Sequence, residues 1–120
     1  LNHKKIECNN PVELDKALIA TGFAYEVKDR ENQIEIIDQL IPKIRDIRRM
    51  GAAATDLCCV ASGMVDGYIE TGLKEWDLAA GSLIAREAGA VVSVQVWRGM
   101  ELTIAAGPEL FEQISRAIPE

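Results

Sequence analysis

Two acidic residues, Glu70 and Asp77, flank a short polar turn and are the side chains in this sequence best suited to chemistry. Before the turn, Val65 to Glu70 combines β-branched and aromatic residues with an Asp-Gly turn signal, which predicts a short strand. After it, apolar residues recur near a 3.6-residue period until Gly89, which predicts a helix that begins at Asp77. These apolar residues are Leu78, Ala79, Leu83, Ile84 and Ala88. The pattern places two carboxylates at a strand-to-helix turn.

The residues themselves leave two interpretations of Asp77 open. At a helix N-cap, a carboxylate accepts a backbone N–H and faces the positive end of the helix dipole, which is a purely structural role. Two neighbouring features favour a further role. The bulky Trp76 would fix the backbone, and the small residues at 79–81 would let a ligand or another chain segment approach the first turn.

A second group of candidates precedes this turn. Gly51, Ala52 and Ala53 open another predicted helix, whose inward face would carry Leu57, Val60, Ala61 and Met64 and which would end at Gly63. Small residues at a helix N-terminus leave backbone N–H groups accessible to an anion or a sugar hydroxyl. Close packing of the helix on a sheet explains the same residues equally well.

Two arginines stand just before that helix. Arg48 and Arg49 could reach a phosphate, but surface or interdomain ion pairs are the commoner use of arginine. Their role stays open.

Three segments together resemble a known family. They are W-D-L-A-A-G at 76–81, R-R-M-G-A-A-A-T-D-L at 48–57 and D-G-Y-I-E at 66–70. They are similar to signatures of the inositol monophosphatase family, the Mg²⁺-dependent, lithium-sensitive sugar and inositol phosphatases. The similarity runs from about residue 17 to about residue 94 without an obvious gap, so it is more specific than one short motif.

The resemblance implies a role for each candidate. Asp77 would ligate the Mg²⁺ ion nearest the leaving group and act in catalysis. Glu70 would accept hydrogen bonds from ring hydroxyls of the substrate, and Gly51, Ala52 and Ala53 would line the wall that binds the polyol. Ala52 stands where many relatives have Ser or Thr, so one side-chain donor is missing.

One half of the family pattern is absent. Members carry, earlier in the chain, a helical Glu and a D-P-[ILV]-D-G-[ST] loop that hold the first metal and the nucleophilic water, whereas this sequence contains no Asp-Pro dipeptide. We therefore expect residues 1–120 to form a single α/β domain, the C-terminal domain of a larger two-domain phosphatase. Its partners would be the N-terminal half, a small phosphorylated polyol substrate and, as in many relatives, a second copy in a homodimer. The isolated chain should have little or no turnover.

Two other functions stay open. A non-catalytic binding or assembly module could keep the fold without the metal loop. Fructose-1,6-bisphosphatases and bisphosphate nucleotidases share the W-D-x-A-A-G turn, and substrate choice depends on loop residues that this sequence does not contain.

Composition narrows the classes of protein to which this chain could belong. With 120 residues, 48% of them hydrophobic, the chain can bury one core of ordinary size. Nineteen acidic against thirteen basic residues give a net charge of −6, which argues against a broad nucleic-acid surface. No apolar run approaches the roughly 18 residues needed to span a membrane and no export signal is evident, so a cytoplasmic enzyme is expected.

The other predicted elements surround these candidates. We expect a buried strand over 17–21, a helix over 32–44 with apolar residues at 34, 37, 40, 41 and 44, and a strand over 46–50. A hairpin through Arg98 and Gly99 should join strands over 90–96 and 103–107, and Pro108 should open a last helix. Residues 1–10 could supply an edge strand. This order predicts an α/β layered sandwich with a mixed central β-sheet flanked by helices.

The remaining polar and reactive residues are interpreted as structural. The cysteines are odd in number and badly placed to pair, so they are taken as core residues of a reducing compartment. His3 lacks a second histidine for a zinc site. Phe23 and Tyr25 are taken as packing residues, and Asp56 and Asp66 as helix-surface and turn residues.

Overall fold

The computed structural model describes residues 1–24 and 26–120, so the prediction for Tyr25 lies outside the described residues. Within them, five strands alternate with four α-helices and two short 3₁₀ helices. The strands are β1 (Leu18–Thr21), β2 (Asp46–Arg48), β3 (Gly67–Thr71), β4 (Val91–Trp97) and β5 (Met100–Ala106). The helices are η1 (Leu14–Lys16), α1 (Val27–Leu40), η2 (Ile41–Lys43), α2 (Ala53–Ser62), α3 (Glu75–Glu87) and α4 (Pro108–Ala117).

The strands form one mixed sheet in the order β2-β1-β3-β5-β4. β1 pairs in parallel with both β2 and β3, whereas β5 is antiparallel to β3 and β4. The tight turn at Arg98 and Gly99 joins β4 to β5, with Trp97 opposite Met100, so the predicted hairpin is confirmed. The sheet thus has a parallel half, with helical crossovers, and an antiparallel half.

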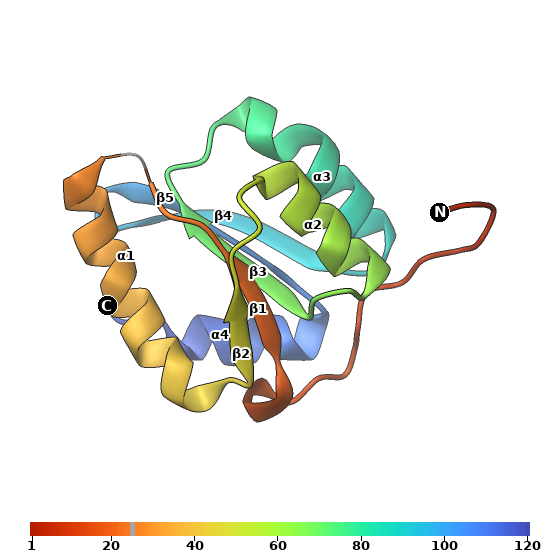
Figure 1. Cartoon of the computed structure of the whole chain (residues 1–120), viewed down its shortest axis with the longest axis horizontal. Coiled ribbons are helices and arrows are strands. Elements are labelled where there is room, and N and C mark those ends of the chain that lie inside the picture. Colours follow the sequence, from red (N-terminus) through yellow and green to blue (C-terminus); the bar gives the residue numbers. More distant parts are fainter. Residues whose placement is uncertain (25) are drawn as a thin grey trace.

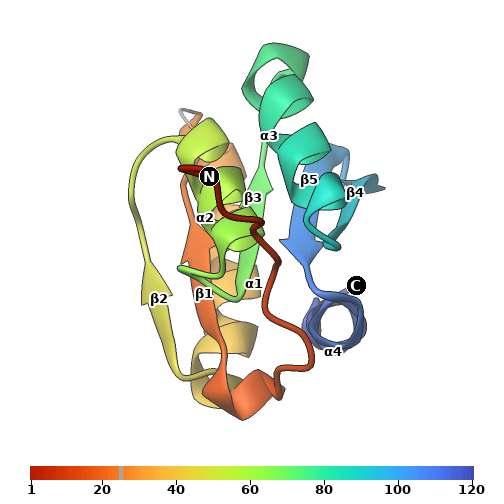
Figure 2. The same cartoon turned by 90° about the vertical axis from the view of Figure 1, so that its right-hand side faces the viewer.

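Two helical layers cover the sheet. α2 and α3 pack on one face around Leu57, Val60, Tyr68 and Ala85, and α1 and α4 pack on the other around Ile36, Ile69 and Ile114. Figure 1 and, from the side, Figure 2 show the two helix pairs on opposite faces. The predicted α/β layered sandwich with a mixed sheet is confirmed.

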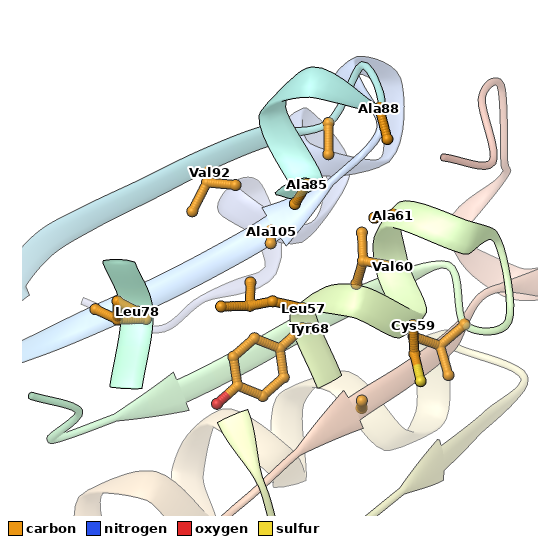
Figure 3. Close-up of a cluster of buried hydrophobic side chains, with 13 residues drawn as sticks. Leu57, Cys59, Val60, Ala61, Tyr68, Leu78, Ala85, Ala88, Val92 and Ala105 are labelled. Atoms are coloured by element: carbon orange, nitrogen blue, oxygen red, sulfur yellow. The ribbon is translucent and has the colours of Figure 1, made fainter. Parts of the chain in front are cut away.

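Small residues let α2 and α3 lie close together, as the close-up of their shared core shows (Figure 3). A Cβ atom at Gly81 would lie 2.8 Å from the Cβ of Leu57, which is too close for any side chain. The buried face of α3 is therefore made of Leu78, Gly81, Ser82 and Ala85. The apolar residues Leu83 and Ile84, which helped to predict this helix, face solvent instead.

α1 differs from its prediction in range and in face. It begins at Val27 and ends at Leu40, because Pro42 cannot continue an α-helix and the chain passes into η2. Its buried face carries Gln33, Ile36 and Leu40, whereas Ile34 is 56% exposed. The assignment of Ile34 to the core was wrong because a buried glutamine occupies a position of the inward face.

Two smaller predictions were also wrong. Residues 1–10 form no strand; instead the Cys8 N–H donates to the Ala88 carbonyl at 2.9 Å, and the Asn9 amide caps the end of α2 through the Gly63 carbonyl. Met64 lies beyond the αL residue Gly63, which ends α2 as predicted, and it is therefore turned to solvent.

Other features agree with the sequence. The three cysteines are free thiols, Cys59 buried and Cys8 and Cys58 half-buried. Among the described residues, no helix has the length and apolar character needed to cross a bilayer.

Candidate functional site

The predicted site residues gather at one edge of the sheet. β1, β2 and β3 run in parallel, so their carboxyl ends meet at the same edge, where α/β proteins commonly bind ligands. Gly22 follows β1, the segment 49–53 follows β2, and Glu70 lies near the end of β3 with Asp77 in the first turn of α3 beyond it. The loops of this edge can be followed in Figure 1.

Glu70 is the centre of this arrangement. Its carboxylate lies directly on the backbone of Gly22, because a Cβ atom at Gly22 would fall 1.6 Å from Oε1 and 2.8 Å from Cδ. Burial raises the pKa of Glu70 to about 7; the charges of Asp56 and Asp77 add to this rise, whereas the Tyr68 hydroxyl and Arg49 oppose it. These four side chains are therefore its electrostatic neighbours.

Asp56 was wrongly assigned to the helix surface. It is 1% exposed, and its Oδ1 atom has no hydrogen-bond partner in the described part of the chain. Desolvation raises its pKa to about 6. Its spacing could have shown this, because Asp56 precedes the inward residue Val60 by four positions and so lies on the same helix face.

Tyr68 is a second buried polar group beside Glu70. Figure 3 shows its ring next to Leu57, and the hydroxyl has no partner in hydrogen-bonding geometry among the described residues. Burial raises the pKa of Tyr68 well above its ordinary value, and the nearby carboxylates raise it further. The phenol is therefore neutral.

Asp77 lies in the helix and not before it. α3 begins at Glu75, with Lys74 as its N-cap residue. The Lys74 N–H donates to Asp77 Oδ2 at 3.0 Å, and the Asp77 N–H donates to the Lys74 carbonyl at 2.9 Å. The predicted start of the helix at Asp77 was thus two residues late, but Asp77 lies near the N-cap and its carboxylate accepts a backbone N–H at the positive end of the helix, as expected.

The residues on either side of Asp77 do not have the roles that the sequence predicted for them. Trp76 is 81% exposed, so it does not fix the backbone. The small residues Ala79 and Ala80 are exposed, whereas Gly81 allows α2 to approach. The half-buried Asp77 carboxylate is held by its reciprocal contact with Lys74 and by the packing of α3 on α2.

The start of α2 is accessible to a ligand. Gly51 adopts a φ of +90°, with nothing within 4 Å of the position of a Cβ atom, and Ala52 is the N-cap residue without a side-chain cap. Ala52 is exposed and Ala53 is half-buried. The first N–H groups of α2 therefore lack a side-chain acceptor and could bind an oxygen ligand.

The two arginines have different surroundings. Arg48 is an exposed residue paired with Asp46 at 2.7 Å. Arg49 lies with its guanidinium 5.8 Å from the centre of the Phe23 ring, and its charge lowers the pKa of Glu70. Arg49 is therefore the arginine that lies toward the carboxylates.

Comparison with known proteins identifies the group to which this chain is related. Residues 1–114 match the sequence pattern of the inositol monophosphatase family. The chain belongs to the inositol monophosphatase family.

Relatives within the inositol monophosphatase family carry two kinds of name. The inositol-1-monophosphatase of Mycobacterium bovis is 45% identical over 116 residues, which cover 94% of this chain and 40% of the relative. The Nus factor SuhB of Vibrio cholerae is 46% identical over 94 residues, which cover 78% of this chain and 35% of the relative. The match thus covers well under half the length of these two relatives.

Solved structures of the inositol monophosphatase family agree on the fold. SuhB of Mycobacterium tuberculosis matches with a TM-score of 0.84 at 44% identity, over 93% of this chain and 44% of that one. Inositol monophosphatase from Anabaena matches with a TM-score of 0.84 at 34% identity, over 98% and 50%. The resemblance inferred from the sequence motifs is confirmed.

Two carboxylates at the site have oxygen atoms that could serve as metal ligands. In the Asp77 carboxylate, only Oδ2 accepts a hydrogen bond from the described residues. In Asp56, Oδ1 has no hydrogen-bond partner among them. Hard oxygen donors of this kind suit Mg²⁺. Among residues 1–24 and 26–120, however, no three His, Cys, Asp or Glu side chains are grouped closely enough to hold a metal ion. Further ligands would have to come from outside this set.

Proposed function

We propose that this chain is the C-terminal part of a Mg²⁺-dependent phosphomonoesterase that hydrolyses inositol monophosphate or a similar small polyol phosphate. The observation that carries the proposal is the meeting of Glu70, Asp77 and the open start of α2 at the carboxyl edge of the parallel strands. Family membership supports the reaction class.

Each residue has a role in this proposal. Asp77 would hold the metal ion nearest the leaving group, oriented by the Lys74 amide. Glu70 would accept hydrogen bonds from ring hydroxyls, and the Gly51–Ala53 backbone would contact the polyol. Arg49 would moderate the negative charge at this edge, where Asp56, Glu70 and Asp77 lie together. A bound Mg²⁺ would neutralise phosphoryl oxygens and the developing alkoxide.

The proposal includes a second segment. Described residues supply no complete metal site, and the relatives are more than twice as long as the matched region. We therefore propose that an N-terminal half contributes the remaining ligands and the water that attacks phosphorus. Lithium sensitivity, a homodimer and a cytoplasmic location, which the resemblance implies, belong to the same proposal.

The first test is the substitution Asp77→Asn in the full-length protein. Asparagine keeps an acceptor for the Lys74 amide, so thermal stability should change little, while Mg²⁺-dependent phosphate release should fall by at least about 100-fold. Glu75→Gln is the matched control, since Glu75 is an acidic residue of the same helical turn that is exposed. It should leave activity within about twofold. Full activity of the Asp77→Asn protein would contradict the assigned role.

A second candidate function rests on the relatives named Nus factor SuhB. Their name allows an assembly module in which the fold serves a protein partner and not a substrate. Phosphate release separates the two. If the full-length protein with Mg²⁺ hydrolyses no polyol phosphate and binds no Mn²⁺ near Asp77, the assembly function is favoured. Preference for fructose bisphosphate or a nucleotide bisphosphate would retain the reaction class and change the substrate.

A further inference from the structure

Gly22 has no conformational reason to be a glycine. Its backbone is outside the left-handed region, so an L-amino acid could adopt the same conformation. What excludes a side chain is the Glu70 carboxylate, whose Oε1 would lie 1.6 Å from the new Cβ atom. Gly22 is therefore required by the position of Glu70 and not by the turn.

Both ends of this contact are fixed by other residues. The Thr21 hydroxyl donates to the Ile69 carbonyl and so joins the end of β1 to β3 immediately before Glu70. The buried Gln33 amide of α1 donates to the Gly22 carbonyl, and its oxygen accepts the Ala24 N–H at 3.0 Å. The loop 22–24 therefore cannot move away from Glu70 without breaking these bonds.

We propose that Gly22 is a specificity-determining residue, because its missing side chain allows the Glu70 carboxylate to lie where it receives the hydroxyl groups of a polyol substrate. Gln33 is the positioning residue that holds the loop beneath this carboxylate. The inference rests on the proposed function, in which Glu70 contacts the polyol, and it adds a role for two further residues, Gly22 and Gln33.

The physical consequence is a displaced carboxylate in a protein that still folds. The group in the way of an alanine side chain is the end of a flexible glutamate, so it can rotate aside at little cost to the fold. The reacting phosphate would be unaffected. Substrate binding through the ring hydroxyls would weaken, which raises KM without lowering kcat.

The test is the substitution Gly22→Ala in the full-length protein. We expect KM for inositol monophosphate to rise about 10-fold, as for a lost hydrogen bond to a charged group, with kcat within about twofold. The KM for p-nitrophenyl phosphate, which has no ring hydroxyls, should stay unchanged. In a Glu70→Ala background, Gly22→Ala should have no further effect, because its action passes through Glu70.

The outcomes are distinguishable. If Glu70→Ala raises KM for inositol monophosphate and Gly22→Ala does not, the inference is overturned while the proposed function stands. An equal effect of Gly22→Ala on both substrates would also overturn it, as would a crystal structure of this variant with the carboxylate in its original place. A wild-type protein that hydrolyses no polyol phosphate would overturn the proposed function and the inference with it.

Discussion

Negative charge at the site exceeds what its neighbours neutralise. Asp56, Glu70 and Asp77 lie near one another, and the charge of Arg49 partly offsets theirs at Glu70. Asp56 is the extreme case, since it is buried with an unpartnered oxygen. Such a group weakens the fold when it is charged, which proteins tolerate mainly where the charge has a use.

Asp56→Asn should therefore stabilise this chain at alkaline pH. The pKa of Asp56 is raised to about 6, so the folded state binds its proton more tightly than the unfolded state does. The destabilisation is complete above pH 6 and disappears as the pH falls toward 4. At pH 8 we expect the variant to gain about 1–3 kcal/mol in the free energy of unfolding, and at pH 4 almost nothing.

Chemical denaturation monitored by circular dichroism at both pH values would measure this difference. Asp38→Asn, an exposed aspartate on α1, is the matched control and should change stability by less than about 0.5 kcal/mol. An equal gain in stability at pH 4 and pH 8 would show that the gain does not come from removing a buried negative charge at Asp56.

Sequence alone found some of these residues and missed others for identifiable reasons. Glu70 and Asp77 stand at element boundaries inside a family motif, so both periodicity and resemblance point to them. Asp56 was missed because aspartate in a helix is ordinarily solvated, although its spacing from Val60 indicates the inward face. The contact of Gly22 with Glu70 was missed because it joins residues far apart in the chain.

At the level of elements, α1 acts as the support of the loop after β1. Its inward face includes Gln33, which is 2% exposed and bonds both Gly22 and Ala24. A buried glutamine on an otherwise apolar face explains why the helix was predicted with the wrong face. Polar residues that satisfy a distant backbone segment are invisible to a pattern of apolar spacing.

Gln33→Leu should destabilise the chain by about 1–3 kcal/mol, because it leaves the buried Gly22 carbonyl and the Ala24 N–H without their partner. Gln39→Leu makes the same change at an exposed position of the same helix and should be nearly neutral. Gln33→Glu keeps the acceptor for Ala24 but turns a carboxylate oxygen toward the buried Gly22 carbonyl, so it should destabilise the chain as well. Thermal denaturation checks the order, and equal stability of all three variants would contradict the supporting role.

The ends of the helices show which boundaries can be predicted from neighbouring residues in the sequence and which cannot. Gly63 and Gly89 were correctly predicted to end α2 and α3, because left-handed glycines at these positions are a local requirement. The start of α3 was misplaced, since an aspartate can cap from the N-cap or reach back from the third helical position. The two alternatives differ by one turn of helix and not in the role of the carboxylate.

For the whole molecule, strand and helix order was enough to predict the fold class. Parallel and antiparallel pairing could also be anticipated, because long helical connections favour parallel strands and a tight turn favours a hairpin. The order of strands and helices does not show which surface of the domain is left with exposed apolar residues. α3 exposes Trp76, Leu83 and Ile84, although helices on the outside of a domain ordinarily expose polar residues.

We propose that this surface of α3 is covered by the N-terminal half in the full-length protein. The isolated chain should then self-associate at micromolar concentration, and the double substitution Leu83→Ser with Ile84→Ser should make it more monomeric by sedimentation velocity. In the full-length protein the same change should lower the melting temperature instead, because there it removes buried contacts.

Ile34 supplies the matched control for this surface. It is an apolar residue of similar exposure, 56% against 60% for Leu83, on α1 at the opposite face of the sheet. Ile34→Ser should leave both the association of the isolated chain and the stability of the full-length protein nearly unchanged. If it reduced association as much as the α3 substitutions do, general surface hydrophobicity would explain the behaviour and α3 would have no special partner.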